Sequence, residues 1–129
     1  MQERQLFEYA VVRWVPQVER DEFINIGVIL YCAKEKFLRV LFHLDESRLS
    51  AFNSSFDRDE LICHLNAINN ICCANEQGGP IAKFDAASRF RWLTAMRSTT
   101  VQTSRVHPGY TVNSVETLNK IFKQQVLLP

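Results

Sequence analysis

The chain has 129 residues, of which 47% are hydrophobic and 22% are charged, and its net charge is +1. These values exclude a disordered tail, a collagen-like repeat and a low-complexity linker, and they fit one domain spanning residues 1–129. No apolar run approaches the roughly 18 residues of a membrane helix. The polar start at residues 1–4 lacks a signal-peptide core, so we expect a cytoplasmic protein.

Alternating apolar residues predict three strands in the first third of the chain. These strands cover residues 6–15, 22–32 and 36–44, and their short connections favour an antiparallel meander. Gly27 falls inside the second strand, where glycine usually marks a bulge or a close backbone approach. Hairpin pairing centred on Glu19 would place Arg13 opposite Asn25.

Helical spacing and capping residues predict helices in the rest of the chain. The expected N-caps are Asp45, Asp57, Asp85 and Asn113. After Asp85 a strand stays open as an alternative, since Phe90 and Trp92 also suit a sheet. Residues 99–106 are rich in β-branched side chains and predict a fourth strand, and His107-Pro108-Gly109 predicts a turn.

These elements together predict an α+β fold. We expect an antiparallel sheet of about four strands, which starts with the three-stranded meander, and helices packed on one face of that sheet.

The cysteines and histidines favour neither a metal site nor a catalytic triad. Cys32, Cys63, Cys72 and Cys73 contain no C-x-x-C pair, so we expect free thiols and no bound cofactor or metal. No nucleophile, P-loop or H-E-x-x-H motif occurs. The sequence therefore favours a non-catalytic domain and assigns no catalytic residue.

Charge is distributed unevenly along the chain. Residues 1–85 carry a net charge of −4 and residues 86–129 a net charge of +5, and no acid lies between Asp85 and Glu116. Arginine beside hydroxyl groups suits a phosphate or carboxylate, because guanidinium forms a planar two-pronged donor. We therefore predict a candidate anion site, for which the residues are Arg13, Asn25, Arg91, Arg97, Ser98 and Thr99.

Each of these residues also has a structural interpretation. The arginines can neutralise the acidic first part of the chain, and a polar pair such as Arg13 and Asn25 can satisfy loop carbonyls. Phe90 and Trp92 between arginines suggest stacking on single-stranded nucleic acid, but the lack of surplus lysines disfavours that partner.

Two blocks of sequence resemble the bacterial domain-of-unknown-function family 3037. The first is YAVVRWVPQVERDEFINIGVILY at residues 9–31, and the second is RFRWLTAMRSTTVQTSRVHPGY at residues 89–110. They match the family's patterns Y-x-V-V-R-[YW]-V-P with E-F-x-N-[IV]-G-V, and R-F-x-W-L with R-S-T. Met96 replaces the proline, and Asn113 the aspartate, expected at those positions.

The resemblance implies no established activity. Genes of this family often lie beside genes for HipA-like kinases of toxin–antitoxin-type systems, which implies a non-catalytic partner or modulator of such a kinase. An alternative is a domain that binds a phosphate-bearing ligand, a nucleotide or a nucleic acid through the arginines of residues 89–105. A hydrolase or nuclease is a second alternative, for which Glu22, Asp45 and Asp85 are the plausible carboxylates.

Overall fold

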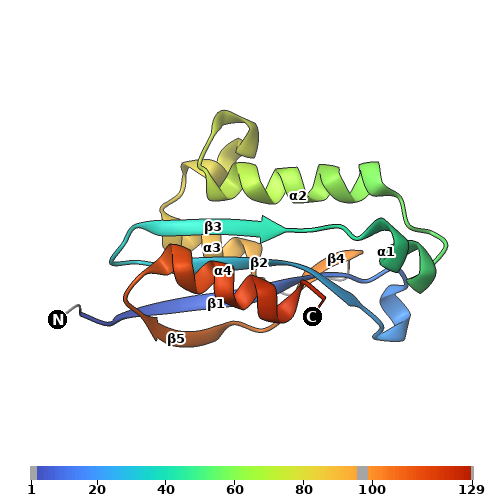
Figure 1. The fold of residues 1–129 in the computed structure, drawn as a ribbon. Coiled ribbons are helices and arrows are strands. Elements are labelled where there is room, and N and C mark those ends of the chain that lie inside the picture. The colour runs from blue at the N-terminus through green and yellow to red at the C-terminus, as the bar shows by residue number, and fades with distance from the viewer. Residues whose placement is uncertain (1–2, 96–98, 129) are drawn as a thin grey trace.

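The computed structural model of the chain describes residues 3–95 and 99–128 (Figure 1). Its strands are β1 (Gln5–Trp14), β2 (Ile24–Cys32), β3 (Phe37–Phe42), β4 (Val101–Thr103) and β5 (His107–Thr111). Its α-helices are α1 (Glu46–Phe52), α2 (Arg58–Cys72), α3 (Ala86–Leu93) and α4 (Ser114–Gln125), with 3-10 segments η1 (Val18–Arg20) and η2 (Glu76–Lys83). The α+β class is confirmed.

Each of these α-helices begins at a predicted N-cap. The side chain of the cap accepts a hydrogen bond from the backbone N–H three residues further on, which removes one unsatisfied donor from the first turn and contributes about 1 kcal/mol. The caps are Asp45, Asp57, Asp85 and Asn113. The segment after Asp85 is therefore helical. Across residues 3–95 and 99–128, no helix combines the length and apolarity needed to cross a membrane.

The sheet is antiparallel, and β1 lies at its centre. The predicted meander gives the order β3-β2-β1, and both later strands pair with the remaining edge of β1. β4 lies opposite residues 12–14 of β1, and β5 lies opposite residues 5–9. Strands that are far apart in sequence thus share one edge of β1.

The structure confirms a fourth strand within residues 99–106 but differs from the prediction in two ways. The fourth strand is shorter than expected, and His107-Pro108-Gly109 is not a turn but the first part of β5. Proline is tolerated in an edge strand when its missing N–H would have pointed away from the neighbour. Gly109 lies so close to Phe7 that an added Cβ would fall 2.6 Å from the ring. Glycine here allows close packing and does not end the strand.

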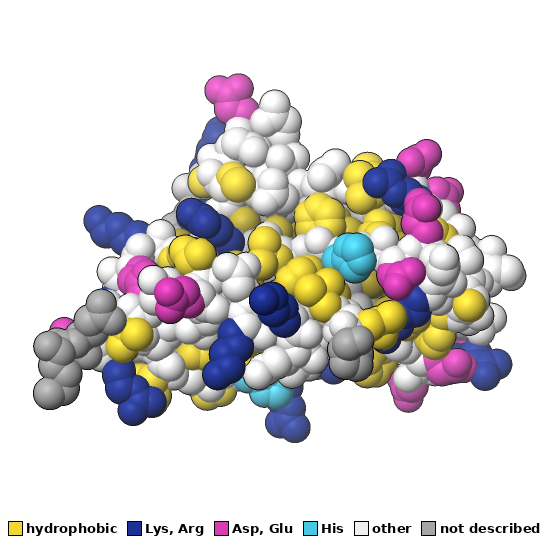
Figure 2. Space-filling view, in the orientation of Figure 1, with side chains coloured by type: hydrophobic (Ala, Val, Ile, Leu, Met, Phe, Trp, Pro, Cys, Tyr) yellow, Lys and Arg dark blue, Asp and Glu magenta, His cyan; other side chains and the backbone are white. Residues whose placement is uncertain are grey.

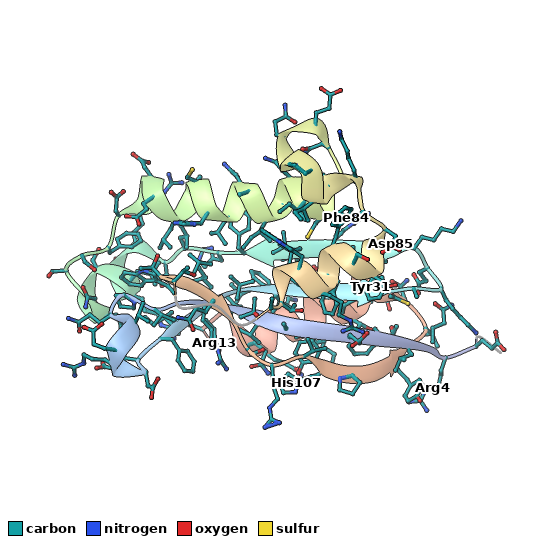
Figure 3. All side chains as sticks on the ribbon, turned by 180° about the vertical axis from the view of Figure 1, so that it is seen from behind. Arg4, Arg13, Tyr31, Phe84, Asp85 and His107 are labelled. Atoms are coloured by element: carbon teal, nitrogen blue, oxygen red, sulfur yellow. The ribbon has the colours of Figure 1, made fainter. Side chains whose placement is uncertain are left out.

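The expectation that helices cover one face of the sheet is also wrong. Helices α1, α2 and α3 pack on one face, around Trp14, Ile29, Leu65 and Phe90. Helix α4 packs on the other face, where Leu118 and Ile121 join a second apolar cluster. Figure 1 shows α4 in front of the sheet, and Figure 3 shows α3 from behind. Strand periodicity alone does not say which helix covers which face.

A β-bulge interrupts the pairing of β1 with β2. Val12 pairs with Gly27 and Arg13 pairs with Asn25, which leaves Ile26 as the extra residue. A Cβ on Gly27 would lie 2.7 Å from the carbonyl oxygen of Leu41. The sequence-based prediction of a bulge or close approach at Gly27 is confirmed, and both features are present.

Replacing Gly27 should therefore destabilise the sheet. We expect Gly27→Ala to lower the free energy of unfolding by about 1–3 kcal/mol, because the methyl group must displace the neighbouring backbone. Urea denaturation measures this change. Lys120→Ala is the control, since Lys120 is exposed on α4 and its loss should change stability little. Equal stability of Gly27→Ala and wild type would contradict the argument.

Candidate functional site

Arg13 and Asn25 form the part of the predicted anion site that the fold brings together. They are paired residues of β1 and β2, as the hairpin symmetry about Glu19 predicts. The side-chain amide of Asn25 donates a hydrogen bond to the backbone oxygen of Gln125 at 3.0 Å, so the pair lies below the end of α4. The guanidinium of Arg13 lies over the ring of Phe23, 4.0 Å from its centroid.

Two polar atoms of this pair are buried and lack a partner among the described residues. They are Nε of Arg13, which is a donor, and Oδ1 of Asn25, which is an acceptor. Burial lowers the pKa of Arg13 from its ordinary value. Buried polar atoms are nearly always satisfied in folded proteins. A donor and an acceptor on paired residues are therefore a place where a small polar molecule can bind.

Arg91 does not join this pair. It lies on α3, on the opposite face of the sheet, and both of its terminal nitrogens donate to the carboxylate of Glu8 at 3.0 Å. These hydrogen bonds raise the pKa of Arg91. The neighbouring Phe90 ring stacks on Tyr31, with the centroids 5.4 Å apart. Glu8 neutralises Arg91, so this arginine ties α3 to β1.

Arg89 has a structural role as well. Its guanidinium donates to the backbone oxygens of Ile71, Cys72 and Phe84 at distances of 2.8–3.0 Å. Two of these oxygens belong to the last turn of α2, whose carbonyls have no helical partner. Cations are favourable at this end of a helix. Part of the positive charge of residues 86–129 thus stabilises the fold itself.

Of the remaining predicted residues, Thr99 lies in the described part of the chain, shortly before β4. Thr99 is exposed, and its hydroxyl donates to the backbone oxygen of Val101 at 2.7 Å. Arg97 and Ser98 lie outside the described residues, as does Met96. The described structure therefore brings together Arg13 and Asn25 only.

A cleft that the sequence did not predict lies next to Asn25. It has a volume of about 290 Å³ and is bordered by polar side chains of β2, α1 and the segments around them, which are Asn25, His43, Asp45 and Arg48. Apolar residues 126–128 of the C-terminal segment also line it. The short separation of His43, Asp45 and Arg48 in the sequence is the signal that could have placed these three side chains together. No local pattern could have placed the C-terminal segment beside them.

The carboxylates proposed for a hydrolase do not converge. Asp45 begins α1, whereas Asp85 begins α3, and Figures 1 and 3 place α1 and Asp85 at opposite ends of the sheet. Glu22 is exposed and pairs with Arg20. Within residues 3–95 and 99–128, no three Cys, His, Asp or Glu side chains are grouped to hold a metal ion.

The fold and these sites define an α+β domain with an antiparallel sheet between α4 and the other helices. The sequence profile of the family described as "Protein of unknown function (DUF3037)" matches residues 9–126, and the chain belongs to this family. No curated protein and no solved structure matches the chain. The resemblance in the two sequence blocks is thereby confirmed.

Cys72 should make stability depend on alkaline pH. Burial raises the pKa of its thiol from the ordinary 9.0 to about 12, and the neighbouring Cys73 adds to this effect. The folded state therefore keeps the proton longer than the unfolded state does. The stability that the protonated thiol of Cys72 contributes to the folded state is complete below pH 9 and is lost as the pH rises towards 12.

We expect the free energy of unfolding of wild type to fall between these pH values by up to about 1.4 kcal/mol per unit more than that of Cys72→Ala. Urea denaturation at several pH values measures the difference. Cys63→Ala, which removes an exposed cysteine, should keep the wild-type slope. Identical slopes for Cys72→Ala and wild type would contradict the expectation.

Proposed function

We propose that this domain is a non-catalytic partner protein that binds a HipA-like kinase. The gene neighbourhood implied by the family suggests the kind of partner. The observation that carries the proposal is an exposed apolar pair on the sheet, formed by Leu6 of β1 and Tyr110 of β5, which face each other across the two strands.

The exposure of this pair supports a protein partner. Leu6 is 53% exposed and Tyr110 is 64% exposed. The guanidinium of Arg4 lies 5.7 Å from the centroid of the Tyr110 ring. Tyrosine beside arginine is a frequent combination at the centre of protein interfaces, where an aromatic ring gives a large contact area at a small entropic cost.

A second candidate function is the binding of a phosphate-bearing ligand at Arg13. The buried, unpartnered Nε of Arg13 favours it, because a bound oxyanion would accept that hydrogen bond. Unlike Arg91, Arg13 has no carboxylate partner within the described part of the chain. This candidate does not depend on the surface formed by Leu6 and Tyr110.

Co-expression tests the kinase proposal. The tagged chain and the kinase encoded next to its gene should elute together on size exclusion, and Tyr110→Glu should separate them because a charge replaces an apolar contact. Phe84→Glu is the control, since Phe84 is also exposed (54%) but lies above α3 in Figure 3, away from Arg4 and β5. Two separate peaks with wild-type chain would exclude the kinase as partner. A complex that tolerates Tyr110→Glu would exclude this surface.

Thermal shift with tripolyphosphate tests the anion candidate. Ligand that binds only the folded state raises Tm, so wild type should become more stable with increasing concentration. Arg13→Met should lose this response. Arg39→Met should keep it, because Arg39 likewise lies over a phenylalanine ring, that of Phe37, but is exposed on β3. Absence of a shift in wild type would remove this candidate.

A further inference from the structure

Strand β5 forms an open edge of the sheet. It pairs with β1 on one side and with no other strand of the described chain on its other side. Figure 1 shows β5 at the lower border of the molecule, with no element drawn beyond it. An open edge offers unpaired N–H and C=O groups to a further strand.

The neighbouring hydrogen bonds show which groups of β5 point outwards. The N–H of Val11 in β1 donates to the side-chain hydroxyl of Ser104, and its C=O accepts from the backbone N–H of Ser104. The N–H of Val15 donates to the backbone oxygen of Thr100. The odd-numbered residues of β1 thus direct their backbone groups towards β4 and β5. In an antiparallel pair, residues whose backbone groups bond to the partner strand alternate with residues whose backbone groups point away from it. Pairs such as Phe7 with Gly109 therefore bond to each other, and the even-numbered residues of β5 face away.

These outward residues are Pro108 and Tyr110. Pro108 has no N–H, but its backbone groups point away from β1, so no hydrogen bond to β1 is lost. The groups left for a partner are the C=O of Pro108 and both the N–H and the C=O of Tyr110. None of the turn, loop and cap hydrogen bonds of the described residues involves these groups. An added strand can bond to all three groups.

Side chains next to this edge provide a place for the partner's side chains. A hollow of about 300 Å³ is bordered by Arg4, Leu6, Tyr31, Lys34 and Tyr110. Glu8 also borders it, but this carboxylate is held by Arg91. The hollow therefore combines apolar walls with two basic side chains, Arg4 and Lys34, that have no carboxylate partner in the described structure.

Charge decides what kind of strand fits. Arg105 lies just before β5, and Arg4 lies over Tyr110 at its other end. Figure 2 shows Lys and Arg side chains along the lower border of the molecule, from the left to the centre, where Figure 1 places β5. Like charges on paired strands are destabilising, so a second copy of β5 would place these arginines in a repulsive environment. An acidic strand is favoured by the same charges.

We infer that β5 receives an extended, acidic segment of a partner protein as a sixth strand, and that alternate side chains of this segment enter the hollow beside Tyr110. The inference deepens the proposed function and rests on it for the existence of a protein partner. It specifies the recognition mode and the charge of the bound segment, and it does not require that the partner be a kinase.

Selection of linear peptides displayed on phage against the immobilised chain tests this inference. The enriched peptides should carry Asp or Glu between apolar residues. Bound to the chain, they should slow hydrogen exchange at the backbone N–H of Tyr110. Tyr110→Ala should weaken binding roughly tenfold. Arg4→Glu with Arg105→Glu should weaken it at least as much and reduce its dependence on salt. Phe84→Ala is the control and should leave the affinity unchanged.

Several results would overturn the inference. They are the absence of enrichment, enrichment of peptides without acidic residues, unchanged exchange at Tyr110 in the complex, and a homodimer that protects this N–H. Circular dichroism shows whether Tyr110→Ala keeps its fold, as its exposure leads us to expect. Acidic peptides bound at β5, together with a kinase that elutes separately, would reject the proposed kinase partner only. A kinase complex without protection at Tyr110 would reject the strand addition only.

Discussion

The β-bulge at Ile26 and Gly27 determines on which face of the sheet each side chain of β2 lies. Beyond the bulge, Val28 and Leu30 belong to the cluster under α4, whereas Ile24 and Ile26 before it belong to the cluster under the other helices. A shift of one residue exchanges the two faces of a strand. Without the bulge, Asn25 would point away from α4 and could not hold the oxygen of Gln125. The absence of a Cβ at Gly27 permits this geometry, because β3 passes within van der Waals distance.

The local elements follow from the sequence because short-range interactions determine them. Period-two alternation located β1 to β3, and capping side chains located the beginning of every α-helix in the described chain. The opposition of Arg13 and Asn25 followed from hairpin symmetry. Pro108 and Gly109 misled the prediction, since both residues usually end strands. Their acceptance in β5 depends on the direction of the proline nitrogen and on the ring of Phe7, which only the assembled sheet defines.

The candidate site was less predictable than the fold. The uneven charge suggested one arginine cluster, but the structure separates its members according to their partners. Arg89 binds carbonyls at the end of α2, and Arg91 binds Glu8, so both serve the packing of α3. Such pairings join residues about 20 to 80 positions apart, and no spacing rule encodes them. Arginines that form no ion pair with a carboxylate in the described structure stay available for a ligand or partner. Among them are Arg4, Arg13 and Arg105.

The shared edge of β1 has a consequence for the growing polypeptide during translation. β2 follows β1 closely and covers one side of it, but β4 and β5 are synthesised roughly 90 residues later. At about 5–20 residues per second, the other side of β1 stays open for several seconds. The backbone N–H and C=O groups on that side, such as those of Val11, are then available to any exposed strand nearby. The interval between these two segments thus sets a period of aggregation risk at this side of β1, which β4 and β5 cover in the finished domain.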